Sequence, residues 1–171
     1  MFPRLTLVIG GAASGKSAYA EQLVCASNRD RAYIATARPL DAEMQAKIAR
    51  HKTLRGDGWT TFEAYENLPE IIAKLDQTSV ALLDCATMWL TNQMMAGAAL
   101  EPGPLKEALA VAPCPIVTVT NELGQGLVPD HAVSRKFREA HGRMNQTLAA
   151  QADLVVLVTA GLPQILKGKL P

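Results

Sequence analysis

Residues 10–17 read "GGAASGKS", which fits the pattern G-x-x-x-x-G-K-[ST] through Gly10, Gly15, Lys16 and Ser17. Small residues let the backbone curl until several N–H groups point at one phosphate, and a helix that begins behind them adds partial positive charge. An apolar run ends just before the pattern, and a helical pattern begins at Lys16. The stretch therefore predicts a P-loop, in which Lys16 neutralises phosphate oxygens and Ser17 joins a Mg²⁺ shell. The alternative is a glycine-rich turn without a ligand.

Short apolar and β-branched runs alternate with helical patterns along the rest of the chain. The runs predict strands over 5–9, 32–36, 59–63, 79–84, 115–120 and 154–159. Helical patterns begin at Lys16, begin after a capping Asp41, and span 132–151. This alternation predicts one α/β domain over 1–171, with a mostly parallel sheet covered by helices on both faces. We expect a loop over 97–104, "GAALEPGP", and a frayed end at "LKGKLP".

Composition narrows the classes of partner and the compartment. The 171 residues carry a formal net charge of +1, so no broad basic field indicates nucleic acid. No stretch approaches the roughly 20 apolar residues of a membrane span. The N-terminal apolar run is too short for a signal peptide, and Cys85 and Cys114 beside apolar runs read as buried free thiols. These features favour the cytoplasm.

Two further strand ends carry polar residues suited to a nucleotide site. Asp84 follows the apolar run "VALL", as a metal-contacting carboxylate does in a Walker B strand, although such a residue also caps helices. "TNELGQGLVPD" at 120–130 follows another strand, and Asn121 and Glu122 would stand at the carboxyl edge, where ligands collect. A polar turn is an equal alternative for these two residues.

A histidine stands among basic residues in "KIARHKTLR" at 47–55. Taken alone, His51 reads as a surface histidine on a charged helix. A neutral imidazole is also a competent nucleophile near pH 7, and neighbouring cations can stabilise a transferring phosphoryl group. In the helix over 132–151, Val133, Phe137, Met144 and Leu148 recur at spacings of four and seven and predict an apolar face. The basic residues of this helix favour a solvated face, whereas Asn145 and Gln146 indicate a polar contact. Trp59 and Trp89 read as core or interface residues.

Several segments taken together resemble one known family. They are "GGAASGKSAYAE", "YIATARPLDAEMQAKIARHK", "WTTFE", "LLDCATMWLTN", "VTNELGQGLVPD" and "FREAHGRMNQTLAAQADLVVLVTAGLP", in this order. The chain is similar over nearly its whole length to the bifunctional adenosylcobinamide kinases/adenosylcobinamide-phosphate guanylyltransferases. The P-loop is common to many families. The His-Lys segment, the N-E-x-G-x-G-x-V-P loop and the G-R-x-N-Q helix are more specific as a set.

The resemblance implies two activities in adenosylcobalamin (vitamin B12) biosynthesis. The first phosphorylates adenosylcobinamide with ATP or GTP. The second transfers GMP from GTP to the resulting phosphate through a guanylylated histidine, and this role falls on His51. A RecA-like P-loop fold and a homotrimer with sites near subunit interfaces are also implied.

Residue roles carry over by position. His51 and Lys16 would be catalytic, and Ser17 and Asp84 would contact the metal. The implied nucleotide contacts are Gly10, Gly11, Ala12, Ala13, Ser14, Gly15, Lys16, Ser17, Thr36, Ala37, Arg38, Lys52, Thr53, Leu54, Arg55, Glu63 and Asp84.

The chain departs from the family pattern in two places. Arg55 is followed by Gly56 where the family often has proline, so we expect a more mobile loop after His51. The 97–104 segment is short and lacks the acidic residues often found there, which bears on the corrinoid contacts. Two rival interpretations remain: a monofunctional P-loop small-molecule kinase that leaves His51 idle, and a nucleotide-binding switch without substrate turnover.

Overall fold

A seven-stranded sheet forms the centre of the computed structural model, which describes residues 1–171 apart from the side chains of Lys47 and Leu54. The strand order is β3-β2-β4-β5-β1-β6-β7. Every neighbouring pair is parallel except β6 and β7, which are antiparallel. The strands are β1 (Leu5–Gly10), β2 (Asp30–Ala35), β3 (Trp59–Glu63), β4 (Ser79–Asp84), β5 (Ile116–Asn121), β6 (Leu154–Thr159) and β7 (Leu162–Lys167).

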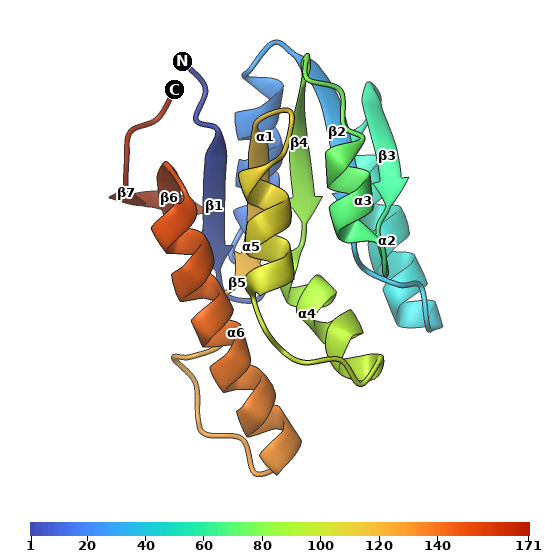
Figure 1. Cartoon of the computed structure of the whole chain (residues 1–171), viewed down its shortest axis with the longest axis vertical. Coiled ribbons are helices and arrows are strands. Elements are labelled where there is room, and N and C mark those ends of the chain that lie inside the picture. The colour runs from blue at the N-terminus through green and yellow to red at the C-terminus, as the bar shows by residue number, and fades with distance from the viewer.

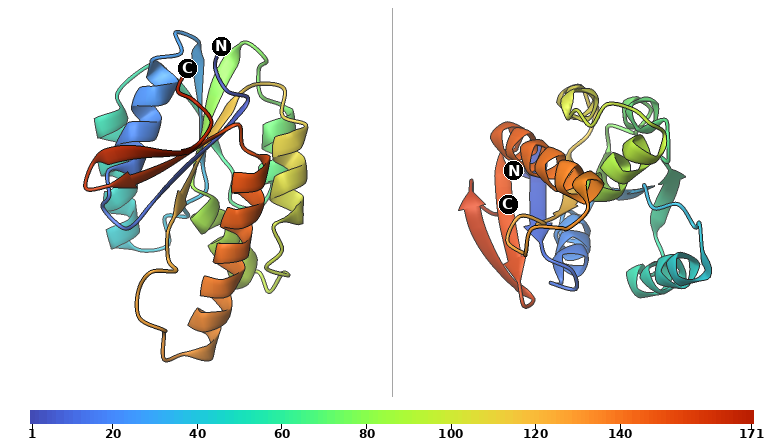
Figure 2. Two further views of the ribbon diagram at one scale, coloured as in Figure 1. Left: turned by 90° about the vertical axis from the view of Figure 1, so that its left-hand side faces the viewer. Right: turned by 90° about the horizontal axis from the view of Figure 1, so that it is seen from below.

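Helices cover both faces of the sheet (Figure 1 and Figure 2). The helices are α1 (Lys16–Cys25), α2 (Ala42–Arg55), α3 (Leu68–Ala73), α4 (Ala86–Met95), α5 (Gly103–Ala110) and α6 (Ala132–Gln151). α1 and α2 lie on one face, whereas α3, α5 and α6 lie on the other, with α4 beside them at the end where the strands finish. The predicted mostly parallel α/β architecture is confirmed.

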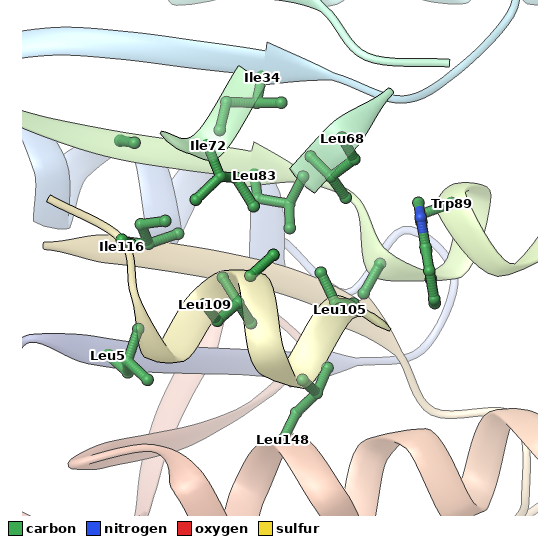
Figure 3. Packing of buried hydrophobic residues seen from close by; sticks show 14 of the residues in the cluster. Leu5, Ile34, Leu68, Ile72, Leu83, Trp89, Leu105, Leu109, Ile116 and Leu148 are labelled. Atoms are coloured by element: carbon green, nitrogen blue, oxygen red, sulfur yellow. The ribbon is translucent and has the colours of Figure 1, made fainter. Parts of the chain in front are cut away.

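The core has two halves, one on each face of the sheet. The larger half packs α3, α4, α5 and α6 against strand residues such as Ile34, Leu83 and Ile116 (Figure 3). The smaller half packs α1 against the opposite face, around Val8, Val119 and neighbouring side chains. All six residues of β1 are buried because this central strand has helices on both sides and a parallel neighbour at each edge.

All six predicted strands are present, each with bounds within two residues of those expected. α1 begins at Lys16 as predicted. Asp41 caps α2, where its carboxylate accepts a hydrogen bond of 2.7 Å from the Met44 amide. Cys85 and Cys114 are buried free thiols, as expected, while Cys25 is exposed.

Three expectations need correction. The loop predicted over 97–104 ends early, since α5 already begins at Gly103. The C-terminal segment expected to fray contributes Leu166 and Lys167 to β7, because that strand pairs with β6. Val133, which the helical spacing placed on the apolar face, is 64% exposed. The first turns of α6 extend beyond the end of the sheet, so no core lies opposite them (Figure 1).

Candidate active site

The loop between β1 and α1 has the shape of a phosphate cradle. Gly15 has φ of 90° at the N-cap of α1, a left-handed conformation that glycine adopts without steric cost. A side chain at Gly10 would place its Cβ 2.7 Å from the carbonyl oxygen of Val158, so only glycine fits there. The Lys16 ammonium donates a 3.0 Å hydrogen bond to the Gly11 carbonyl, which folds this side chain back over the loop.

Neighbouring strands brace the same loop. The amide of Gly161, in the β6–β7 turn, donates a 2.8 Å hydrogen bond to the Ser14 carbonyl, and the Glu122 amide donates a 3.0 Å hydrogen bond to the Gly10 carbonyl. The Ser14 hydroxyl is buried and has no hydrogen-bond partner within the described part of the chain. The backbone of the cradle is therefore held by the protein itself, and it presents an unsatisfied buried hydroxyl where a ligand oxygen would be favoured.

Asp84 stands at the carboxyl end of β4, held by the strand beside it. The Tyr33 hydroxyl donates a 3.1 Å hydrogen bond to its Oδ2. Burial raises the pKa of Tyr33 strongly, and the negative charge of Asp84 raises it further, so this phenol stays a donor. Burial also raises the pKa of the Cys85 thiol to about 12, and the cation of Lys16 opposes that rise. Lys16 and Asp84 thus act on the same thiol from the same end of the sheet.

The predicted nucleotide residues after β2 have structural partners. Thr36 is fully buried; its hydroxyl accepts from the Cys85 amide at 2.7 Å and donates to the Cys85 carbonyl at 2.8 Å. Arg38 donates a 2.6 Å hydrogen bond to the Glu66 carboxylate and lies over the ring of Tyr65. Ala37 lies between them and is half-buried.

α2 carries His51 on a helix that packs weakly. None of its described side chains is buried, and His51 and Arg55 are only half-buried. Lys52 and Thr53 are exposed, and the predicted contact Leu54 lies outside the described side chains. Helices with few buried side chains open at lower free energy than packed ones.

Arg55 fixes the C-terminal end of α2. Its guanidinium carbon lies 3.4 Å from the centre of the Tyr33 ring and 5.8 Å from that of Trp59. Burial raises the pKa of Glu21 on α1, the charge of Arg55 lowers it, and Asp84 raises it. Arg55 is therefore close enough to Glu21 of α1 to act on its carboxyl group, although the family resemblance implied for Arg55 only a nucleotide contact.

The predicted residues form two groups rather than one. The P-loop follows β1, whereas His51 lies on the connection between β2 and β3, at whose end Glu63 is exposed. β4 and β5 separate β2 from β1 in the sheet, a separation of roughly 14 Å at the usual strand spacing. Asp84, on β4, lies between the two groups and touches the second through Tyr33.

A buried polar network lies at the carboxyl end of β5; the sequence indicated a polar contact for Asn145 but not the other members of this network. His141 on α6 is buried, and its Nε2 lies 2.9 Å from the Thr87 hydroxyl, which accepts from the Asn121 amide at 2.9 Å. Asn145 accepts a 2.8 Å hydrogen bond from the Thr120 hydroxyl and donates one of 2.9 Å to the Asn121 carbonyl. The mid-helix asparagine was the signal that indicated such a contact. The network fixes the strand end from which Asn121 and Glu122 emerge.

Comparison with known proteins fits this arrangement. The family model described as cobinamide kinase / cobinamide phosphate guanyltransferase matches residues 6–166. The chain belongs to this family. It is 39% identical over 176 residues to the bifunctional adenosylcobalamin biosynthesis protein CobU of Escherichia coli (strain K12), covering 92% of this chain and 97% of that one. It is 37% identical to CobP of Pseudomonas aeruginosa, which bears the same bifunctional description, covering 95% and 97% of the two chains.

Solved structures support the fold alone. A RadB recombinase superposes with a TM-score of 0.51 at 16% identity, covering 90% of this chain and 73% of that one. A type III secretion ATPase gives 0.53 at 13% identity, covering 91% and 51%. The fold is thus that of the P-loop NTPases, as predicted. Among the described residues, no helix is long and apolar enough to cross a membrane.

Proposed function

We propose that this chain phosphorylates adenosylcobinamide with ATP or GTP and then transfers GMP from GTP to the adenosylcobinamide phosphate. The products are adenosylcobinamide-GDP and pyrophosphate, in the biosynthesis of adenosylcobalamin. The observation that carries this proposal is a braced P-loop and a histidine-bearing helix in one chain of the cobinamide kinase / cobinamide phosphate guanyltransferase family.

The kinase step uses the P-loop. Backbone amides of the loop and the α1 N-terminus bind the β- and γ-phosphates, and Lys16 neutralises the charge that builds on the transferring group. The hydroxyl of adenosylcobinamide attacks the γ-phosphorus, the bond to the β-phosphate oxygen breaks, and the hydroxyl proton is released. This step needs no protein nucleophile, which leaves His51 for the second reaction.

The residues present fit a Mg²⁺ ion bound with the nucleotide. Mg²⁺ in such sites keeps several waters and takes one or two protein oxygens beside the phosphates. The described residues contain no group of three or more His, Cys, Asp and Glu side chains that could bind a metal ion by themselves. Ser17 and Asp84 would each supply one oxygen to the ion, and the bound ion would neutralise phosphate charge. Tyr33 orients the Asp84 carboxylate through Oδ2.

The transferase step runs through His51. A ring nitrogen of the neutral imidazole attacks the α-phosphorus of GTP, a P–N bond forms, the bond to the β-phosphate oxygen breaks, and pyrophosphate leaves. An oxygen of adenosylcobinamide phosphate then attacks the same phosphorus and returns the electron pair to the imidazole. The GTP that donates the guanylyl group is held by residues after His51 and at the end of β3: Lys52, Thr53, Leu54, Arg55 and Glu63. Thr36, Ala37 and Arg38, which follow β2, line the same nucleotide site.

We also infer a homotrimer in the cytoplasm. On α4, Trp89 and Leu90 are buried inside the domain, so they are not available for a contact between subunits. Met95, which is 72% exposed, stays available for a contact between subunits. Light scattering of active protein should give about three times the 18.3 kDa of one chain; a monomer would contradict the trimer.

Labelling tests the proposed function. GTP labelled at the α-phosphate should label the protein without any corrinoid, and the label should be lost in acid and kept in base, as expected for a phosphoramidate. His51→Ala should abolish labelling and GMP transfer while sparing much of the kinase step, and γ-labelled GTP should leave no label on this histidine. Lys16→Ala should lower kinase turnover more than about tenfold, a loss above 1.4 kcal/mol.

The contrary outcomes are equally defined. Undiminished α-label on His51→Ala would move the nucleophile elsewhere, with exposed His131 the next histidine to replace, since His141 is buried. A phosphorylated product without GMP transfer by the unmodified chain would instead support a monofunctional kinase. Binding of GTP without any corrinoid product would support the nucleotide-binding switch.

A further inference from the structure

A groove of about 520 Å³ lies between the 122–131 loop and residues 135–146 of α6. Gly124, Val128 and Pro129 line it from the loop, and Arg143 and Gln146 line it from the helix, together with neighbouring α6 residues. Loop and helix project past the sheet at the end where the parallel strands finish, which is also the end that carries the P-loop (Figure 1 and Figure 2). Glu122, where this loop begins, donates its amide to the Gly10 carbonyl of the P-loop.

Two sequence motifs meet across this groove. The loop motif N-E-x-G-x-G-x-V-P supplies one wall, and the helix motif G-R-x-N-Q supplies the other. Asn145 points into the protein, and its hydrogen bonds with Thr120 and Asn121 explain why an asparagine occurs at this position. Arg143 and Gln146 face the groove and are exposed, so the fold itself does not require these two residue types.

Gly142 gives an independent indication. Glycine in the middle of a helix costs about 1 kcal/mol relative to alanine. A Cβ at Gly142 would meet no atom within 4 Å, so no close approach of the described chain requires glycine there. The position has intermediate exposure and lines the groove. A ligand that approaches the helix backbone at Gly142 would explain why glycine occupies this position despite its lower helix stability.

The loop wall is formed before any ligand arrives. Arg138 donates hydrogen bonds of 2.5–3.0 Å to three loop carbonyls, those of Gly124, Gly126 and Leu127. Arg135 donates to the carbonyls of Pro129 and Asp130 at 2.9 and 2.7 Å. These bonds hold the loop against the helix, so little ordering entropy is left for binding.

The charge of the groove favours an anion. Three arginines, at positions 135, 138 and 143, and one carboxylate, Glu139, line it, which gives a formal charge of +2. Arg143 and Glu139 lie 3.9 Å apart, and their side chains are 60% and 73% exposed. A pair this long and this exposed contributes little, so the Arg143 guanidinium can turn to a phosphate and bind it through two N–H groups.

We propose that this groove binds the phosphate-bearing arm of adenosylcobinamide phosphate, the acceptor of the transferase step. Arg143 contacts the phosphate, Gln146 offers an amide to the amide side chains of the corrinoid, and Gly142 lets the arm lie against the helix. The corrin ring stays outside the groove. This assignment rests on the proposed function and adds the acceptor site to it.

Binding of adenosylcobinamide phosphate to the full chain, followed by calorimetry, tests the proposal. Arg143→Gln and Gly142→Ala should each weaken binding about tenfold or more, equivalent to 1.4 kcal/mol. Gly142→Ala should at the same time raise the melting temperature or leave it unchanged, because alanine is the better helix former. Lys136→Gln, which removes a positive charge from the same helix outside the groove lining, is the matched control and should bind as the unmodified chain does.

GTP serves as the second ligand, because its phosphates share the chemistry of the proposed ligand. The groove variants should bind GTP and take α-label at His51 like the unmodified chain. Weakened GTP binding with unchanged corrinoid binding would assign the groove to the nucleotide and overturn the proposal. Unchanged corrinoid binding in Arg143→Gln and Gly142→Ala would overturn it as well. An unmodified chain without affinity for adenosylcobinamide phosphate would refute the proposed function together with the groove.

Discussion

Asn145→Ala should destabilise the protein while leaving the groove lining in place. Asn145 is 8% exposed and makes two side-chain hydrogen bonds, of 2.8 Å from Thr120 and 2.9 Å to the Asn121 carbonyl. Each neutral hydrogen bond contributes about 1 kcal/mol, and a partner left buried and unsatisfied adds a desolvation cost. Thr120 is fully buried, but its hydroxyl has His141 Nε2 at 3.4 Å as a second partner. We therefore expect a loss of about 2–3 kcal/mol.

Denaturant unfolding followed by circular dichroism measures this loss. For a chain of this length it corresponds to a melting temperature lower by about 4–12 °C. Gln146→Ala is the matched control: it removes the adjacent amide, which is exposed, and should change the unfolding free energy by less than about 0.5 kcal/mol. If Asn145→Ala stays within that range at an unchanged m-value, the hydrogen bonds of Asn145 do not stabilise the fold.

Two other predictions concern groups that the sequence did not single out. Tyr33→Phe keeps the ring under Arg55 but removes the hydrogen bond to Asp84, so the Mg²⁺ concentration for half-maximal kinase activity should rise about tenfold; an unchanged Mg²⁺ titration would disprove this role. Burial lowers the pKa of His141, with Glu122 opposing. Folding therefore disfavours its protonation, and stability should fall as the pH drops through about 6.5, the unfolded value. His141→Gln should flatten the dependence of unfolding free energy on pH between 7.5 and 5.5, and equal slopes would contradict this.

The sequence predicted the central elements well because their physics is local. The apolar run from Leu5 to Ile9 is too short for a typical helix and ends at a glycine-rich turn, which indicates a buried strand. Asp41 marks a helix start because its side chain can cap the residues that follow. β7 was missed for the opposite reason. All six side chains of β7 are exposed, so its sequence lacks the hydrophobic pattern of a buried strand. The strand forms because its backbone pairs with the free edge of β6. The signal was the turn at Ala160 and Gly161, both with positive φ.

The candidate site divides along the same line. The P-loop was readable because its backbone conformation demands particular small residues at particular positions. Tyr33 could not be predicted as a site residue, because an aromatic residue in a buried strand is typical of the hydrophobic core. Only the structure shows that its hydroxyl donates a hydrogen bond to Asp84. His141 was hidden similarly, since its partner Thr87 lies 54 residues away in the chain. Such pairings depend on strand order, which hydrophobic periodicity does not encode.

The position of β1 in the sheet has a consequence for how the protein is made. The ribosome synthesises Leu5–Gly10 before the neighbours of this strand, β5 and β6, and before Gly161, whose amide braces the Ser14 carbonyl. At about 5–20 residues per second, roughly 8–30 s pass between the emergence of β1 and that of β6. During this time the apolar segment has no parallel partner on one side, which is the condition under which nascent chains recruit chaperones or aggregate. The nucleotide cradle is therefore completed only after Gly161, far along the chain from the loop that it braces, has been synthesised.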